Sequence, residues 1–354
     1  GGGIALAWII EGGGVLRDGA LRPGSLALAE GLIAEDAAPG AHRFDARGLC
    51  VMPGLVDIHG DAHERQLQPR PGIGFPVALA IRDSAIQILA AGITTAYLGV
   101  TLSWEPGLRS REMYRALLPA LAAARAETTA DLRIHLRFEA DNLDALDEAL
   151  AGIADGHVQL VGFNDHTPSI VRGLALPHKV AKYAERAGVS TDRFAELAHA
   201  AFARRGAVPA ARERLAAACR TAGVPMLSHD DHTVAHTDVF RALGSTICEF
   251  PTAEIVARDA KARHEPVVMG APNVVRGGSH IGWASAAPLA EEGVVTILAS
   301  DYYWPAMFEA AFVLEERGVM DLAQSWALVS ANPARALGLT DRGRIAPGLR
   351  PAGT

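Results

Sequence analysis

The sequence is poor in cysteine and lacks the segments that direct a chain into a membrane or out of the cell. Its 354 residues include three cysteines, Cys50, Cys219 and Cys248, without the close spacing of a zinc ribbon or a disulfide framework. We therefore expect buried thiols in a reducing cytoplasm. The sequence has no apolar run long enough to span a bilayer and no signal peptide with a basic start and a small-residue cleavage site.

Blocks of basic residues are also missing. The formal net charge is -7, so we expect neither nucleic acid nor a membrane surface as a partner. Apolar residues make up 49% of the chain, enough for a sizeable core without covalent staples. We expect a homo-oligomer.

The first 50 residues are divided by frequent turn residues. Short apolar pieces such as Leu6 to Ile10 alternate with turn residues, namely Gly12-Gly13-Gly14, Pro23-Gly24, Glu30-Gly31 and Pro39-Gly40. Turns at such short intervals favour hairpins over helices. Residues 1–50 are therefore predicted to form part of a small β domain outside the main body.

From Val51 onwards, short β-rich apolar runs alternate with stretches rich in Ala, Leu, Glu and Arg. After the opening strand the runs are Thr94 to Val100, Leu132 to Phe138, Val158 to Phe163, Pro225 to Ser228, Thr246 to Phe250, Val267 to Gly270 and Val294 to Ala299. The pattern predicts an α/β fold, a (β/α)8 TIM-like barrel over residues 51–330, with a doubly wound open sheet as the alternative.

Two helices between these strands have clear patterns. Asn142 to Ile153 is predicted to be capped by Asp141, and Ala253 to Arg263 follows Thr252. The segment Leu174 to Arg205 is a long insertion that either covers the site or packs on the barrel.

The stretch Val51 to Glu64 ends in ligand-type residues. Side chains at positions i and i+2 of a strand point the same way, so His59 and Asp61 can bind one cation together. Imidazole and carboxylate are ligands that zinc and related ions accept. A polar strand end facing water is the alternative for this pair alone.

Four further strand ends carry the same residue types, in Glu139, Asn164-Asp165-His166, His229-Asp230-Asp231-His232 and Ser300-Asp301. Each one alone has an ordinary explanation as a helix cap or a structural histidine. Active sites of such barrels lie at the C-terminal ends of the strands, where these residues would meet. Together they predict a metal site.

The predicted ligands are His59, Asp61, Glu139, His166, His229 and Asp301. Six ligands exceed what one tetrahedral ion needs, which indicates two divalent ions with a hydroxide between them. Zinc is favoured, with manganese, iron and magnesium as alternatives. Asp301 is the predicted catalytic residue, which orients the hydroxide and takes its proton. Partners that orient the imidazoles are predicted to be Asp165, Asp230 and Asp231, and His63 is either a further ligand or a substrate contact.

The sequence also resembles a known family. The stretch VMPGLVDIHGD, the strand ends NDH and SHDD, the run MGAPNVVRGGSH from Met269 to His280, and ASDYY from Ala299 to Tyr303 resemble the amidohydrolase superfamily. Within it they resemble the diphosphatases of the carbon-phosphorus lyase pathway, because His-x-Asp replaces the more usual His-x-His and Pro69-Arg70-Pro71 follows.

This resemblance implies a metal-dependent barrel with a small β-sandwich domain built from both chain ends. It also implies hydrolysis of α-D-ribose 1-methylphosphonate 5-triphosphate to the 5-phosphate and pyrophosphate, in phosphonate metabolism. Residues 331–354 would return to the small domain, whose final strands are expected to be missing.

A triphosphate requires cations and N–H donors around its oxygens. The residues predicted to bind it are Arg276, Ser279, His280, Arg70 and Arg65, with Arg137 and Lys179 as further candidates. The alternative for each arginine is pairing with the acidic rim. Two other functions remain open, since fold and metal do not fix the substrate: hydrolysis of an amide or cyclic amide, and non-catalytic binding on the same scaffold.

Overall fold

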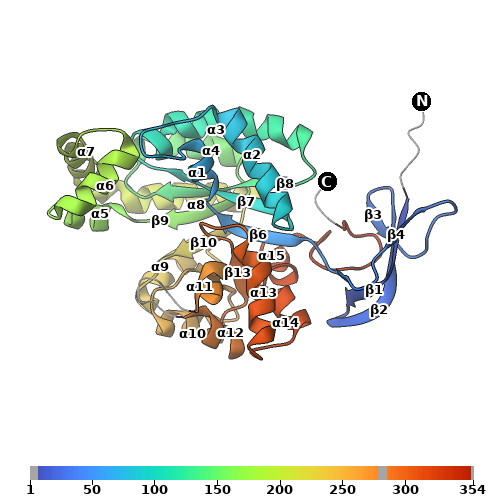
Figure 1. Ribbon diagram of the computed structural model, residues 1–354. Helices are drawn as coiled ribbons and strands as arrows, with labels where there is room; N and C mark the ends of the chain where they lie inside the picture. The colour runs from blue at the N-terminus through green and yellow to red at the C-terminus, as the bar shows by residue number, and fades with distance from the viewer. Residues whose placement is uncertain (1–6, 278–284, 352–354) are drawn as a thin grey trace.

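The protein consists of a parallel barrel and a small mixed sheet, which lie on the left and right of Figure 1. The computed structural model describes residues 7–277 and 285–351. The barrel strands pair in chain order, each parallel to the next. They are β6 (Leu55–Gly60), β7 (Ile93–Leu102), β8 (Asp131–Glu139), β9 (Leu160–Asn164), β10 (Met226–His229), β11 (Ile247–Glu249), β12 (Val267–Gly270) and β13 (Ile297–Ala299). The predicted barrel is confirmed.

The first and last strands close the barrel through the backbone. Gly60 and Asp301 form a parallel bridge. The N–H of Asp61 donates to the carbonyl of Asp301 at 2.8 Å, and the N–H of Asp301 donates to the carbonyl of His59 at 2.9 Å. An open doubly wound sheet has no such connection, so this alternative is wrong.

Helices pack around the strands and bury the apolar faces between the two layers. They are α1 (His63–Leu67), α2 (Val77–Ala90), α3 (Arg111–Glu127), α4 (Leu146–Ala154), α8 (Val208–Ala222), α9 (Val234–Leu243), α10 (Glu254–Ala262), α11 (Ala271–Arg276), α12 (Ala286–Glu291), α13 (Ala306–Glu316), α14 (Leu322–Ala327) and α15 (Ala331–Ala336). A second apolar cluster joins inward residues of several strands, among them Val56, Leu160 and Val268.

The predicted cap of the helix after β8 is wrong. A 3-10 turn, η2 (Leu143–Ala145), precedes α4, and no side chain caps either element. The carboxylate of Asp141 instead accepts a hydrogen bond from Arg205 at 2.6 Å. An ion pair with a distant guanidinium has replaced a local hydrogen bond that the sequence pattern favoured.

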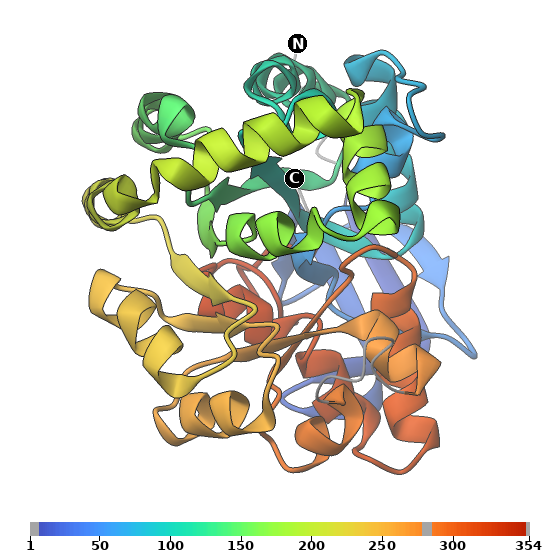
Figure 2. The same cartoon turned by 90° about the vertical axis from the view of Figure 1, so that its left-hand side faces the viewer.

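After α5 (Thr167–Gly173), the insertion Leu174 to Arg205 forms α6 (Pro177–Ala187) and α7 (Thr191–Ala203). These helices lie at the far left of Figure 1, and Figure 2 views the barrel from that side. The ring of Trp104, just beyond β7, lies 5.5 Å from that of Phe194, and its Nε1 donates to Thr167 Oγ1 at 2.9 Å. Contacts with the β7 loop therefore pack the insertion on the barrel.

The N-terminal sheet contains β1 (Trp8–Arg17), β2 (Ala20–Ala29), β3 (Leu32–Ala34), β4 (His42–Asp45) and β5 (Cys50–Val51). The predicted hairpins are present, but two of the predicted turns lie inside strands. Gly12-Gly13-Gly14 belongs to β1, where the register shifts, and Pro23-Gly24 belongs to β2. A Cβ on Gly13 would lie 2.7 Å from the carbonyl oxygen of Leu49, so this glycine allows close chain packing.

The C-terminal segment returns to this sheet. The N–H of Ile33 donates to the carbonyl of Leu349, and the N–H of Gly348 donates to the carbonyl of Ile33, both at 2.8 Å. Ile345 packs with Val15 and Leu26 in a small apolar cluster. The division into residues 1–50, 51–330 and 331–354 stays a prediction.

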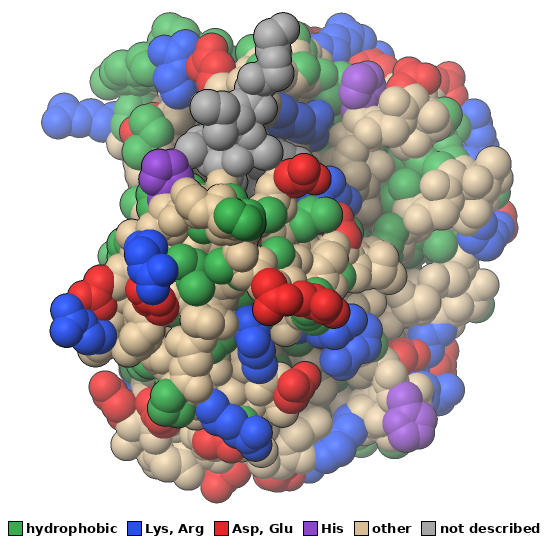
Figure 3. Space-filling view, turned by 90° about the vertical axis from the view of Figure 1, so that its right-hand side faces the viewer, with side chains coloured by type: hydrophobic (Ala, Val, Ile, Leu, Met, Phe, Trp, Pro, Cys, Tyr) green, Lys and Arg blue, Asp and Glu red, His purple; other side chains and the backbone are tan. Residues whose placement is uncertain are grey.

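Acidic and basic side chains are interspersed on the face of the molecule that Figure 3 shows. Across residues 7–277 and 285–351, no helix combines the length and the apolar character that crossing a membrane requires.

Closure of the barrel leads to the first prediction. A Cβ on Gly60 would lie 2.6 Å from Ser300 Oγ and 2.7 Å from Asp57 Oδ2, so Gly60→Ala forces these buried groups apart. We expect the free energy of unfolding of the chelator-treated protein to fall by about 2 kcal/mol in urea titrations. The control is Gly206→Ala, where the added Cβ meets nothing within 4 Å and stability should not fall. Equal stability of the two variants would contradict the close fit at Gly60.

Candidate metal centre

The first and last barrel strands bring together a group of three ligand-type residues. His59 is buried at the end of β6, Asp61 follows that strand, and Asp301 follows β13. One ligand atom from each of the three lies within 4.8 Å of the other two. The backbone bridge that closes the barrel therefore also assembles this group.

A second group comes from the neighbouring part of the rim. His166 follows β9, His229 ends β10 and Asp230 comes next, and their ligand atoms also lie within 4.8 Å of one another. Oδ2 of Asp230 lies 3.1 Å from Nδ1 of His229 and 3.6 Å from Nε2 of His166. The predicted partner Asp230 thus contacts both predicted histidine ligands.

The two groups adjoin each other across the barrel mouth. The ring centroid of His229 lies 5.8 Å from that of His59 and 5.9 Å from that of His166. Arg137 also reaches both groups: its Nη1 lies 3.4 Å from Asp61 Oδ2, and its Nη2 lies 3.4 Å from His229 Nε2. The structure therefore places predicted ligands from β6, β9, β10 and β13 in one continuous site.

Glu139, another predicted ligand, contacts the second group and the start of α5. Its Oε1 accepts the backbone N–H groups of His166 at 2.8 Å and Thr167 at 3.0 Å, and also the Thr167 hydroxyl at 3.0 Å. Thr167 begins α5, so Glu139 binds N–H groups that a helix start leaves without partners. Its Oε2 lies 3.2 Å from Nδ1 of His166. Glu139 therefore supports the second group and lies beside Asp141 and Asp165.

The carboxylates strongly affect the charge of the site. Burial disfavours a charged His166, but Asp230 and Glu139 outweigh this effect and raise its pKa to about 9. Burial also opposes ionisation of Glu139, yet its bonds to His166 lower its pKa to about 2. For Asp301, burial together with the nearby charge of Asp61 raises the pKa to about 7.

The other predicted orienting residues contact different groups. Oδ2 of Asp165 accepts hydrogen bonds from Arg205 at 2.5 Å and Arg212 at 2.9 Å, so this carboxylate is held by guanidinium groups and not by an imidazole. Asp231 lies 3.3 Å from Nδ1 of His236, which is not a predicted ligand. His63 is buried in α1, and its Nδ1 has no hydrogen-bond partner among the described residues.

Two of the predicted substrate residues converge on Tyr302, next to Asp301. Arg65 donates to the carbonyl of Tyr302, and Arg276 donates to its hydroxyl at 3.4 Å. Arg70 is exposed in the loop after α1, where it forms a bridge with Ile73. Ser279 and His280 lie outside the described residues.

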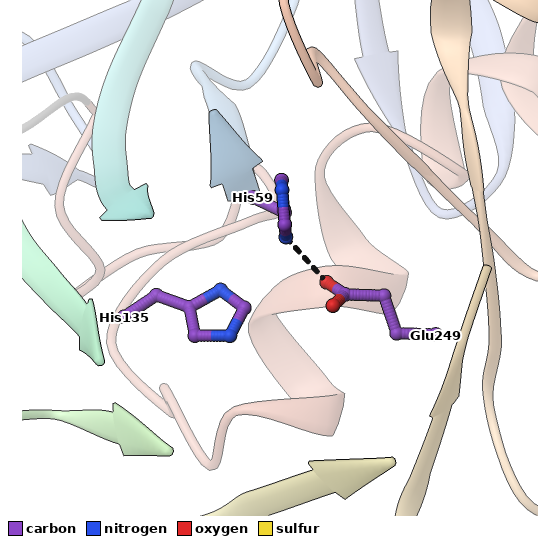
Figure 4. Close-up of side chains that lie close together, drawn as sticks. All are labelled: His59, His135 and Glu249. Atoms are coloured by element: carbon purple, nitrogen blue, oxygen red, sulfur yellow. Dashed lines mark hydrogen bonds and ion pairs between the residues drawn. The ribbon is translucent and has the colours of Figure 1, made fainter. Parts of the chain in front are cut away.

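Sequence reasoning missed His135 and Glu249, which join His59 in a buried group that Figure 4 shows. His135 could have been found from alternation along β8, where His135, Arg137 and Glu139 share one face. Glu249 follows an apolar pair at the end of β11. A carboxylate at the end of such a short apolar strand is the sequence pattern that could have indicated Glu249 as a site residue.

The donor set fits divalent ions. Nδ1 of His229 is buried and makes no hydrogen bond within the described chain, although Asp230 lies close to it. The carboxylates of Asp61 and Asp301 lie near each other and near the imidazole of His59. Burial keeps the pKa of His59 well below its usual value, which favours the neutral imidazole that binds a metal ion. A cation would offset the repulsion between the two acids and would use imidazole lone pairs that have no other partner.

Comparisons with known proteins agree with this geometry. No family model matches the chain. The chain is 35% identical over 315 residues to the α-D-ribose 1-methylphosphonate 5-triphosphate diphosphatase of Escherichia coli (strain K12), covering 87% of this chain and 83% of that protein.

Solved structures share the fold. The N-acetylglucosamine-6-phosphate deacetylase of Pasteurella multocida has a TM-score of 0.60 at 10% identity, covering 98% of this chain and 94% of the other. The 5-methylcytosine deaminase of Klebsiella pneumoniae has a TM-score of 0.59 at 17% identity, covering 97% and 89%. The identity to the diphosphatase over most of both chains shows that this chain belongs to the family of the α-D-ribose 1-methylphosphonate 5-triphosphate diphosphatases, and the solved structures show the shared fold.

Proposed function

We propose that this protein is a metal-dependent hydrolase that cleaves a phosphoanhydride of α-D-ribose 1-methylphosphonate 5-triphosphate and releases pyrophosphate, in phosphonate metabolism. The observation that carries the proposal is the meeting of the two ligand groups at the mouth of the barrel. The 35% identity to a diphosphatase of that substrate supports the choice of reaction.

Each ligand group would hold one divalent ion. His59, Asp61 and Asp301 would bind the first ion, and His166, His229 and Asp230 the second. Glu139 would orient His166 and remain close enough to contribute an oxygen. Zinc fits the mixture of imidazole and carboxylate best, with manganese, iron and magnesium as alternatives.

Bound ions would lower the pKa of a water molecule and polarise the phosphoryl oxygens. Asp301 would take the proton from the attacking water, since its carboxylate lies beside His59 and Asp61, where the first ion would bind that water. The backbone of Asp301 is fixed by the barrel closure, so its carboxylate keeps a constant position relative to His59.

The arginines at the rim would bind the phosphates. Arg65 and Arg276 reach Tyr302 from α1 and α11, and guanidinium groups there could contact the triphosphate beside Asp301. Charge that builds up on the leaving pyrophosphate would be stabilised by these cations. Ser279 and His280 remain proposed contacts on sequence grounds alone.

Hydrolysis of an amide or cyclic amide is the second candidate, because the same metal centre can serve it. We place the reaction in the cytoplasm, where the free cysteines would stay reduced: Cys219 and Cys248 are buried as expected, whereas Cys50 is exposed. Assembly into a homo-oligomer stays a prediction.

Asp301→Asn tests the proton acceptor. Asp301 has a φ of 57°, a conformation that asparagine also adopts, so the backbone should be retained. We expect part of the metal to remain bound and pyrophosphate release to fall by about 10³-fold, because the amide cannot take the proton. Metal analysis measures the bound metal, and an assay with ribosyl and nucleoside triphosphates measures pyrophosphate release. Asp192→Asn, on the exposed side of α7, is the control, and full activity of Asp301→Asn would refute the assigned role.

The two-ion assignment predicts the metal content of a ligand variant. His59→Ala removes a ligand of the first group and leaves the second group intact, so bound metal should fall from two ions per chain to one. Elemental analysis after dialysis against zinc measures this content. His199→Ala, exposed on α7, should keep both ions. An unchanged content in His59→Ala would show that this group does not bind an ion.

Arg276→Gln tests the phosphate contact. We expect KM for the triphosphate to rise about 10-fold with a small change in kcat, because the side chain would bind substrate without touching the attacking water. Arg193→Gln, whose guanidinium pairs with Glu196 on α7, serves as the matched control. If KM stays the same and an amide substrate is cleaved, the amide function replaces the proposed one.

A further inference from the structure

Glu249 has no assigned role, yet its side chain is completely buried at the end of β11, inside the barrel mouth. Its Oε1 lies 3.0 Å from Nδ1 of His59. Figure 4 shows these two side chains facing each other, with the ring of His135 beside the same space. The buried carboxylate of Glu249 therefore contacts Nδ1 of the proposed metal ligand His59 and leaves Nε2 on the other side of the ring.

The contact can hold the hydrogen of His59 on one of its two nitrogens. Oε1 of Glu249 accepts a hydrogen bond from Nδ1 of His59 when that nitrogen carries the hydrogen. Nε2 then keeps its lone pair, which a metal ion requires. The hydrogen bond also fixes the rotation of the ring, because Oε1 lies on one side of the imidazole only.

A glutamate at position 249 is not expected to increase the stability of the fold. Its Oε2 makes no hydrogen bond to any residue in the described ranges, and Nε2 of His229 lies 3.6 Å away from it. A buried charge with an unsatisfied oxygen destabilises a fold compared with an apolar side chain of similar size. The position is therefore better explained by a function in the site than by packing.

Glu105 provides a useful contrast. It is also buried at the rim, just beyond β7, but its carboxylate pairs with the guanidinium of Arg186 and accepts from the hydroxyl of Ser103. Its charge is thus compensated by a cation. Glu249 has an imidazole where Glu105 has a guanidinium.

We propose that Glu249 is a positioning residue that holds His59 in the tautomer and orientation required to bind a metal ion. This inference rests on the proposed metal centre and adds a residue to it. It concerns how tightly the first ion is bound, and it does not depend on which substrate the protein cleaves.

The test compares Glu249→Met, Glu249→Gln and Glu105→Met in two measurements. Zinc affinity is measured by competition with a chelator, and the stability of the metal-free protein by urea unfolding. Glu249→Met should bind the first ion about 10- to 100-fold more weakly, while the metal-free protein is as stable as the unsubstituted chain or more so. Glu249→Gln, which can still accept from Nδ1, should show a smaller loss of affinity.

Glu105→Met should give the opposite pattern, because it leaves Arg186 without its partner: lower stability and unchanged zinc affinity. A merely structural role for Glu249 would lower stability and affinity together, which would overturn the proposal. Unchanged zinc affinity in Glu249→Met would overturn it as well. If Glu249→Met does not fold, Glu249→Gln decides by the same comparison.

Cobalt substitution separates positioning from direct ligation. The visible absorption spectrum of the cobalt-loaded Glu249→Gln protein should match that of the unsubstituted chain at saturation, since the same atoms would bind the ion. A changed spectrum, or one ion fewer at saturation, would make Glu249 a ligand and overturn the positioning role. Absence of metal uptake by the unsubstituted protein would refute the metal centre and this inference together. Metal uptake without pyrophosphate release would refute only the proposed reaction.

Discussion

The backbone pairing between β6 and β13 is the constraint on which the rest of the site depends. The N–H groups of Asp61 and Asp301 each donate across this junction, to Asp301 and His59 respectively. These two bonds join the first and last strands of the barrel and fix the relative positions of three ligand-type residues. Gly60 lies at the same junction, where a side chain would collide with Ser300 and Asp57. The hydrogen bonds that close the barrel thus also bring the first ligand group together.

The sequence predicted the barrel, for a physical reason. Strand periodicity determines which side chains share a face, and parallel strands in a barrel end on one rim, so His59, Asp61 and Asp301 could be assigned to one place. The strands of the N-terminal sheet were harder to predict. Gly12 to Gly14 lies within β1, where a Cβ on Gly13 would collide with the carbonyl oxygen of Leu49, and a local turn rule cannot detect that contact.

The pairing of each acidic residue at the rim could not be predicted. Asp165 and Asp230 both stand beside a histidine in the sequence, yet Asp165 meets guanidinium groups from the insertion and from α8, whereas Asp230 meets imidazoles. Glu139 meets the start of α5. Apart from His229, these partners are distant in the sequence, and their approach depends on packing that strand periodicity does not describe. Glu249 was missed for a related reason, because its role depends on a ring contributed by another strand.

Backbone conformation indicates that the rim is under strain. Asp230, Phe250 and Asp301 all have positive φ values, of 56°, 50° and 57°, and each follows a barrel strand at the site. Such conformations destabilise a non-glycine residue by roughly 1 kcal/mol or more each, and they persist only where the surroundings enforce them. Here the surroundings are the barrel itself, whose apolar clusters lie between the strands and the outer helices and inside the barrel. The barrel can therefore hold closely spaced acids and strained turns at one end, and cations bound there would recover part of the lost stability.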